Sequence, residues 1–235
     1  MPEEKNRNAL IPRPPSALER GGPRGILTRM VSDALAVARS QEKALTVARF
    51  RIGNDEFCDP DYRQILLWAK ALELEPEDVV QRLRSRAWES AEEEEEYAFE
   101  VENGAIISLV WDFDLLPLTV FEWVEALAIR ELCFKGTPKV SPQIALRLSF
   151  LDRLTCCSIN LTELDLSNVP GLTDLWCSEN QLTELNLSNV PGLTVLWCDD
   201  NQITELDIRQ LKTKKLKTLD CGTSATIRKR RDQQI

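Results

Sequence analysis

Hydrophobic residues recur with a fixed spacing in the second half of the chain. Residues 161–181 read LTELDLSNVPGLTDLWCSENQ, and residues 182–202 repeat the same positions as LTELNLSNVPGLTVLWCDDNQ. A tandem this close predicts one structural unit stacked on its copy, because neither unit can bury its apolar face alone. Surfaces built by such repetition serve binding more often than catalysis.

Each copy carries leucines, a cysteine and an asparagine in one frame. The frame is L-x-x-L-x-C-x-x-N-x-L, and its two occurrences are Leu172, Leu175, Cys177, Asn180 and Leu182, then Leu193, Leu196, Cys198, Asn201 and Ile203. This pattern resembles the leucine-rich repeat, and the short unit resembles the bacterial members of that family. The resemblance implies an α/β solenoid: a right-handed superhelix with short parallel β-strands on its concave face.

The same frame extends in both directions and predicts about six repeats. Strands are expected to start near residues 106, 129, 151, 172, 193 and 216. Alternation of inward and outward residues in each frame is strand spacing. Asn180 and Asn201 look like the asparagine ladder of the family, whose buried amides bond the turning backbone. Residues 118–128 have helical apolar spacing, so a short helix is expected there, with later connections extended or 3₁₀.

The part of the chain before the repeats divides into two segments. Residues 1–25 are rich in proline and glycine, which predicts a disordered leader. Residues 26–102 predict a small α-helical domain that caps the first repeat or docks the array on a second partner. The repeats should occupy residues 103–227, and residues 228–235 form a basic tail.

Four local patterns lie within the predicted helical domain. Residues 26–50 have helical spacing, and residues 51–58 look like a turn or hairpin. Asp59 before Pro60 predicts an N-cap. Residues 75–78 predict the start of a second helix, with acids near its positive end, that continues through the glutamates at 92–96 until Asn103 and Gly104.

Composition lowers the expectation of an enzyme. The chain has 235 residues, a net charge of −9 and no histidine, which removes the commonest general base and metal ligand. It contains no P-loop and no G-x-G-x-x-G motif. We therefore expect no catalytic residues, no cofactor and no metal. The alternative is an enzyme site in the helical domain, around Cys58 with Asp55, Asp59 and Asp61.

Seven cysteines bear on the compartment. Cys156, Cys177, Cys198 and Cys221 share one repeat position, which predicts a ladder of small buried residues. A line of side chains about 5 Å apart does not converge on a zinc ion. Free thiols favour a reducing compartment, and the N-terminus has no signal peptide and the chain no membrane span. A cytoplasmic location is expected, with non-classical secretion left open.

The residue before the cysteine in each frame should point out of the concave sheet. Trp176 and Trp197 take this position in the central repeats, so we expect them side by side and exposed, about 5 Å apart. Tryptophan is a frequent interface anchor. The other expected partner-binding residues on this face are Asp174, Ser178, Asp199, Thr155, Arg153, Glu131, Lys135 and Asp220. In the alternative interpretation, duplication copied Trp176 with its unit and the rings only shield each other.

Three functions remain open at this point. The first is a non-catalytic module, or scaffold, that binds another protein through the concave face; acids around the tryptophans suit a partner with Lys or Arg. The second is a secreted bacterial effector or adaptor acting on a host protein. The third is the enzyme described above. No small-molecule substrate is expected, and neither nucleic acid nor membrane is favoured.

Two charged features have alternative interpretations. Glu163, Glu184 and Glu205 align, as do Asp165, Asn186 and Asp207, which suits either Ca²⁺ or a solvated edge. The basic run at 228–231 suits either an anionic ligand or a polar end of the array.

Overall fold

A computed structural model describes residues 49–85, 88–89, 96–124, 126–212, 216–223 and 225–231. The chain divides into two compact units, Met1–Ala44 and Leu45–Ile235, and every described residue belongs to the second. The predicted leader, and all of the helix predicted over 26–50 except its last two residues, lie outside the described residues. Arg49 and Phe50 belong to a strand and not to a helix.

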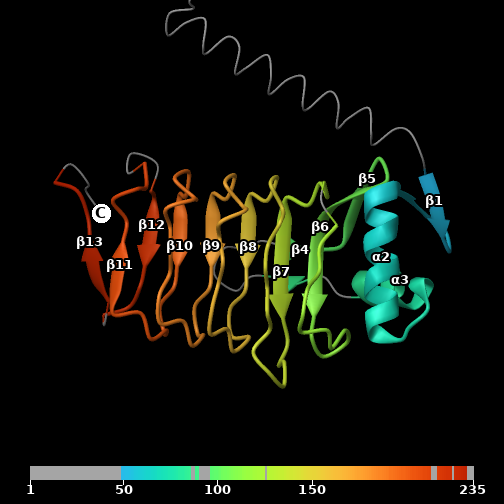
Figure 1. The fold of residues 1–235 in the computed structure, drawn as a ribbon, viewed down its shortest axis with the longest axis horizontal. Coiled ribbons are helices and arrows are strands. Elements are labelled where there is room, and N and C mark those ends of the chain that lie inside the picture. The colour runs from blue at the N-terminus through green and yellow to red at the C-terminus, as the bar shows by residue number, and fades with distance from the viewer. Residues whose placement is uncertain are drawn as a thin grey trace, which may run out of the picture. The chain divides into compact units, whose positions relative to one another are not determined.

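A seven-stranded sheet forms the spine of the second unit, and the chain coils through it as a β-solenoid (Figure 1). Neighbouring strands pair in parallel, except that β5 is antiparallel to β6. In spatial order the strands are β12 (Thr218–Asp220), β10 (Val195–Trp197), β9 (Asp174–Trp176), β8 (Arg153–Thr155), β7 (Glu131–Lys135), β6 (Ala105–Asp112) and β5 (Glu100–Glu102). A parallel strand therefore lies at each of the six positions that the repeat frame predicts.

One leucine of each parallel strand points inward, and the register stacks these leucines in a column. The column is Leu109, Leu132, Leu154, Leu175, Leu196 and Leu219. The first five have no exposed surface, and only the last is partly buried. Burying one leucine contributes about 1.5–3 kcal/mol, so the column is a main source of stability.

The predicted asparagine ladder is present in the two central coils. The Asn180 amide nitrogen donates to the carbonyl oxygens of Cys156 at 2.7 Å and Cys177 at 3.0 Å. Its Oδ1 accepts from the backbone N–H of Leu161 at 3.0 Å. Asn201 donates in the same way to Cys177, 2.9 Å away. Each amide thus satisfies backbone groups of two successive coils.

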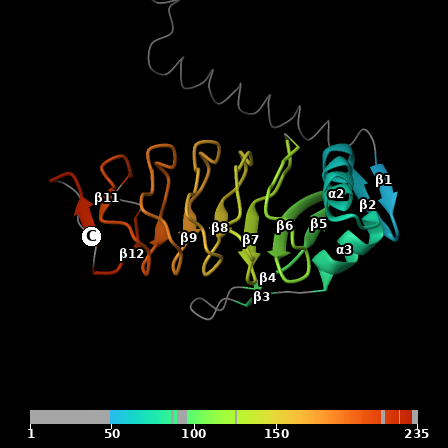
Figure 2. The same ribbon diagram turned by 60° about the horizontal axis from the view of Figure 1, so that its bottom comes forward.

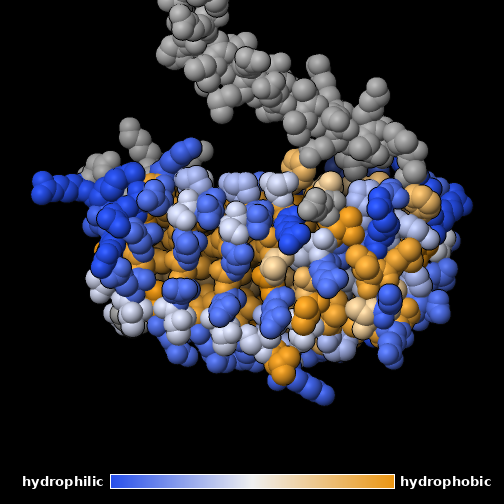
Figure 3. Space-filling model, viewed as in Figure 1, coloured by the Kyte–Doolittle hydropathy of each residue, from blue (hydrophilic) through white to orange (hydrophobic). Residues whose placement is uncertain are grey.

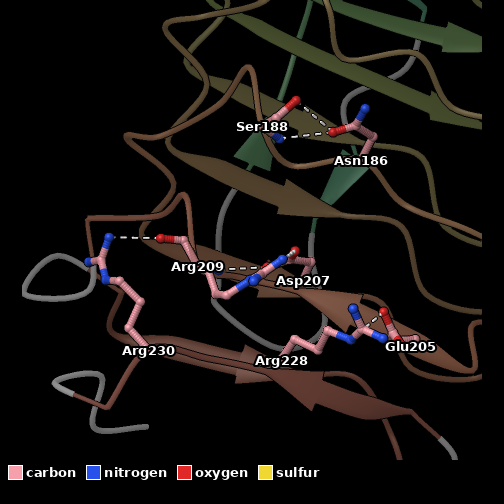
Figure 4. Close-up of polar contacts among 7 residues, drawn as sticks. All are labelled: Asn186, Ser188, Glu205, Asp207, Arg209, Arg228 and Arg230. Atoms are coloured by element: carbon pink, nitrogen blue, oxygen red, sulfur yellow. Dashed lines mark hydrogen bonds and ion pairs between the residues drawn. The ribbon is translucent and has the colours of Figure 1, made fainter.

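A second pair of strands lies on the opposite edge of the last coil. β11 (Glu205–Asp207) pairs in parallel with β13 (Thr226–Arg228). At this edge the aligned residues Asp165, Asn186 and Asp207 each accept a hydrogen bond at Oδ1 from the backbone N–H two residues on, at 2.9–3.0 Å. Figure 4 shows the last two of these turns. The side chains therefore fix the turn of each coil.

The helix predicted over 118–128 is wrong for the residues described there, which exclude position 125. Those residues contain a bridge and a turn but no helix. Phe121 and Trp123 are buried on either side of the exposed Glu122, which is strand spacing. The next coil also supplies backbone partners: Gln143 N–H donates to Thr119 at 2.7 Å. This lateral pairing replaces helical hydrogen bonds.

The segment before the sheet is mixed and not purely helical. β1 (Arg49–Ile52) and β2 (Asp55–Cys58) form the expected hairpin. α2 (Asp59–Leu72) follows with Pro60 in its first turn, although Cys58 and not Asp59 is its N-cap residue. α2 and a second helix, α3 (Pro76–Arg84), pack beside the first strands. The rings of Trp68 on α2 and Trp111 on β6 lie 5.0 Å apart. This packing covers the end of the leucine column.

The second helix is shorter than the sequence predicts. α3 (Pro76–Arg84) starts where expected, but Ser85 ends it. The strands β3 (Trp88–Glu89) and β4 (Glu96–Tyr97) then pair antiparallel, so the helix does not run on to Glu96; residues 92–95 lie outside the described residues. Asn103 and Gly104 form the turn from β5 to β6, both with positive φ. Lateral strand pairing again overrides local helix propensity.

Candidate binding site on the outer sheet face

The outer sheet face is the side of β6–β12 opposite the leucine column. Its central line of residues is Val110, Cys133, Thr155, Trp176, Trp197 and Asp220, in register from strand to strand. Trp176 and Trp197 are therefore lateral neighbours, as the repeat predicts. Strands in a sheet lie about 4.8 Å apart, which sets the spacing of the two side chains.

The half of this face over β6–β8 is covered. Ser108, Val110, Cys133 and Thr155 point outward but are all at most 3% exposed. The β3–β4 pair lies on this side of the sheet, beneath β6 and β7 in Figure 2, and β4 contacts β6. Thr155, which the sequence placed among the partner-binding residues, is therefore buried.

The half over β9–β12 is open. Asp174, Val195, Trp197, Asp199 and Asp220 are all partly exposed. Trp176, at the border between the halves, is 7% exposed. The expected pair of exposed tryptophans is thus one partly exposed ring beside one buried ring.

Hydroxyl groups hold the carboxylates of the open half in place. Asp174 accepts hydrogen bonds from the Thr173 hydroxyl at 2.6 Å and the Thr194 hydroxyl at 3.1 Å. The Ser178 hydroxyl donates to Asp199 in the next coil. The bonds from Thr194 and Ser178 cross from coil to coil, and all three bonds orient the acids without neutralising them. Sequence reasoning missed Thr173 and Thr194, although their shared repeat position was a signal.

The remaining carboxylates of the open half have neutral donors too. Glu179 accepts from the Ser158 hydroxyl at 2.7 Å, and Asp220 accepts from the Gly222 backbone N–H at 3.0 Å. Among the described residues, no lysine or arginine forms an ion pair with Asp174, Glu179, Asp199, Asp200 or Asp220. The open half is consequently acidic, and no lysine or arginine of the described residues balances the charge of its carboxylates.

The basic residues expected on this face lie toward the covered half. Arg153 faces Glu131 with 3.7 Å between Nη1 and Oε1, and Lys135 faces Asp112 with 3.8 Å between Nζ and Oδ2. All four side chains are at most 36% exposed. Of the ten predicted partner-binding residues, Glu131, Lys135 and Arg153 thus have charged partners on this face. The acids Asp174, Asp199 and Asp220 lie near Trp197 instead.

Two buried indole N–H groups lie along this central line without an acceptor. The Nε1 atoms of Trp176 and Trp197 are both buried and have no hydrogen-bond partner among the described residues, as is also true of Ser108 Oγ over the covered half. Most buried donors in proteins are paired, so two unpaired donors in adjacent coils are unusual.

In the alternative site around Cys58, the side chains of Cys58 and Asp61 contact each other, whereas Asp55 and Asp59 each pair with an arginine. Burial, aided by the adjacent carboxyl of Asp61, raises the pKa of Cys58 to about 12, and its thiol donates to Asp61 Oδ2 at 2.6 Å. Asp55 pairs with Arg84, and Asp59 pairs with Arg63. The other oxygen of Asp61 accepts from Ile106 N–H at 3.0 Å. These groups tie α2 to β6 and leave no ionised thiol.

The cysteine ladder is buried as predicted. Cys156, Cys177 and Cys198 are at most 1% exposed, Cys221 at the last coil is half-buried, and all seven cysteines are free thiols. Burial raises the pKa of the Cys156 and Cys177 thiols well above the usual range. Within the described residues, no group of three or more Cys, Asp or Glu side chains is arranged to hold a metal.

The basic residues near the C-terminus contact the preceding coil. Arg228 pairs with Glu205 at 2.7 Å, and Arg209 pairs with Asp207 at 2.6 Å (Figure 4). Hydrogen bonds from Arg209 lower the pKa of Asp207 to about 2. Of the two interpretations of this tail, the contacts favour the polar end.

Comparison with known proteins identifies no relative: no family model, curated protein or solved structure matches the chain. Among the described residues, no helix combines the length and the apolar character needed to cross a bilayer. The function therefore has to be argued from the site itself.

Proposed function

We propose that this protein is a non-catalytic protein-binding module of the leucine-rich-repeat type. The observation that carries the proposal is Trp197, which is partly exposed on the open half of the outer sheet face among uncompensated acids. A tryptophan that a partner can cover supplies a large contact area at little entropic cost. Hydroxyl groups hold the acids Asp174, Glu179 and Asp199 of the open half in fixed positions, as a recognition surface requires.

The N-terminal segment acts in this proposal as the cap of the solenoid. Trp68, Trp111 and Phe121 pack together there, with ring centroids of neighbouring pairs 5.0 Å apart. The seven free thiols support a reducing compartment inside the cell. The free thiols favour this location over an oxidising extracellular one.

The test is affinity capture from native lysate with the full chain and its Trp197→Ala variant. We expect at least one protein that wild type enriches to be lost with Trp197→Ala. Val140→Ala serves as the matched control, because Val140 is 60% exposed but lies away from the outer sheet face. Circular dichroism and urea unfolding verify that both variants fold. Equal recovery of all proteins by the three chains would remove the proposal.

A further inference from the structure

The open half of the outer sheet face has a specific charge arrangement around one ring. Trp197 lies beside Trp176 on one side and Asp220 on the other. Asp199 is two residues farther along the same face of the chain, and Asp174 is diagonally opposite on β9. Lateral neighbours in a sheet lie about 5 Å apart and diagonal ones about 7–8 Å apart. One ring is thus surrounded by three carboxylates.

We propose that Trp197, Asp199 and Asp220 receive an arginine side chain of the partner protein. This inference rests on the proposed function and names the chemistry of the partner. A guanidinium is planar, stacks on tryptophan faces and presents five donors, so one arginine can cover the ring and reach two carboxylates. The carboxylates have spare acceptor capacity, since neutral groups provide their present donors.

Two independent observations support a ligand at this place. The first is charge complementarity: the five acids of the open half lack a described cation, although the same face pairs Arg153 with Glu131 and Lys135 with Asp112 over its covered half. The second is the indole N–H of Trp176, a residue more than nine-tenths buried, which has no acceptor within the described part of the chain. A backbone carbonyl beside the partner's arginine would satisfy a donor of this kind after a small rearrangement.

The fixed positions of the acids favour arginine over lysine. Asp199 is held by the Ser178 hydroxyl of the neighbouring coil and Asp220 by the Gly222 backbone N–H, so their oxygens do not follow a mobile charge. A rigid pair of acceptors is best matched by the rigid donor fork of a guanidinium. A lysine ammonium would gain the charge attraction but neither the stacking nor the two-point geometry.

The experiment uses the full chain and a synthetic probe, the peptide acetyl-(Arg-Gly)₄-amide, in isothermal titration calorimetry at low salt. Matched peptides replace each arginine with citrulline, which keeps the shape without the charge, or with lysine. We expect the arginine peptide to bind several-fold more tightly than the lysine peptide, and the citrulline peptide to bind at least tenfold more weakly. Equal binding of the arginine and lysine peptides would overturn the proposal, because it would indicate attraction to net charge alone.

Variants locate the contact. Asp199→Asn combined with Asp220→Asn should weaken the arginine peptide about tenfold, and Trp197→Leu should remove its advantage over lysine. Glu163→Gln combined with Glu184→Gln removes the same charge from the exposed opposite edge and should leave binding within twofold. An equal loss with both double variants contradicts the site.

The outcome separates this inference from the proposed function. If the arginine peptide fails while capture of a cellular protein still depends on Trp197, the partner uses another chemistry and protein binding stands. If neither measurement depends on Trp197, both proposals fall.

Discussion

Arg230 donates hydrogen bonds from its guanidinium to the backbone carbonyl oxygen of Arg209, 2.7 Å away and one coil earlier in the sequence. Figure 4 shows this bond. The same guanidinium also donates to the carbonyl oxygen of Leu211 at 3.3 Å. Backbone groups of successive coils also bond each other directly, as Gln202 N–H does to Leu182 and Ile208 N–H does to Arg228. The Arg230 side chain adds to the backbone bonds that join the final strand segment to the coil before it.

Replacing Arg230 with alanine should therefore loosen the end of the solenoid. We expect a loss of about 1–2 kcal/mol in the free energy of unfolding, because two carbonyl groups lose a charged donor. Urea unfolding followed by circular dichroism measures the change. Arg231→Ala is the control, because the Arg231 side chain is exposed and this substitution removes the same charge. Equal destabilisation by both variants would mean that charge, and not the hydrogen bonds, matters.

Asn180→Ala should be among the most destabilising changes to a polar residue. Asn180 is 7% exposed and bonds backbone groups of two coils, so its removal leaves buried donors and acceptors unpaired. A loss of about 2–4 kcal/mol is expected in urea unfolding. Asn189→Ala, at an exposed turn position of the same array, should change stability by less than about 0.5 kcal/mol. A small effect at Asn180 would contradict the ladder.

Stability should fall as pH rises through the titration of Asp61. Burial raises the pKa of this carboxyl from 3.8 to about 6, so the folded chain binds the proton more tightly than the unfolded chain. The protonated form therefore stabilises the fold below pH 4, and this contribution, on the order of 2–3 kcal/mol, is lost between pH 4 and pH 6.

Asp61→Asn tests this assignment by urea unfolding at several pH values. The variant should lose most of the fall in stability between pH 4 and pH 6, because an amide does not titrate there. Asp59→Asn, two residues away and partly exposed in its pair with Arg63, should retain it. An unchanged pH profile for the Asp61 variant would assign the dependence to other groups.

Thiol labelling should divide the seven cysteines by burial. Cys157 and Cys221 are partly exposed, and the remaining five are buried, four of them at zero exposure. Iodoacetamide acts on exposed thiolates, so mass spectrometry of the native chain should find these two modified first. Full labelling in urea is the positive control. Rapid native modification of Cys177 would show that the coils open more readily than the structure implies.

The repeated part of the fold was predictable because the same 21-residue unit occurs twice in the sequence. Leu175 and Leu196 occupy equivalent frames, and equivalent frames in a solenoid are lateral neighbours. The strand positions, the buried cysteines and the asparagine ladder all follow from that register. The match between the two copies indicates which residues, distant in sequence, lie side by side, and a single segment carries no such indication.

The parts that the sequence did not predict are those that lack a second copy. Phe121 and Leu127 fit helical spacing, yet the backbone there takes its partner from Gln143 in the next coil. Val110 on β6 is likewise buried on the outer face, where β6 is contacted by β4, a strand that local spacing did not predict. Local spacing reports neither lateral pairing nor what lies over a surface, so the open half of the site became visible only in three dimensions.

The register between β9 and β10 has a consequence for the history and design of this chain. The two central coils meet through the same leucine, cysteine and asparagine, so a further copy of residues 182–202 inserted after position 202 would meet an equivalent coil before it. The number of coils can therefore change while the chain still folds. Recombination within the gene can add or delete whole coils. Each added coil would bring one more tryptophan and one more pair of acids to the recognition surface.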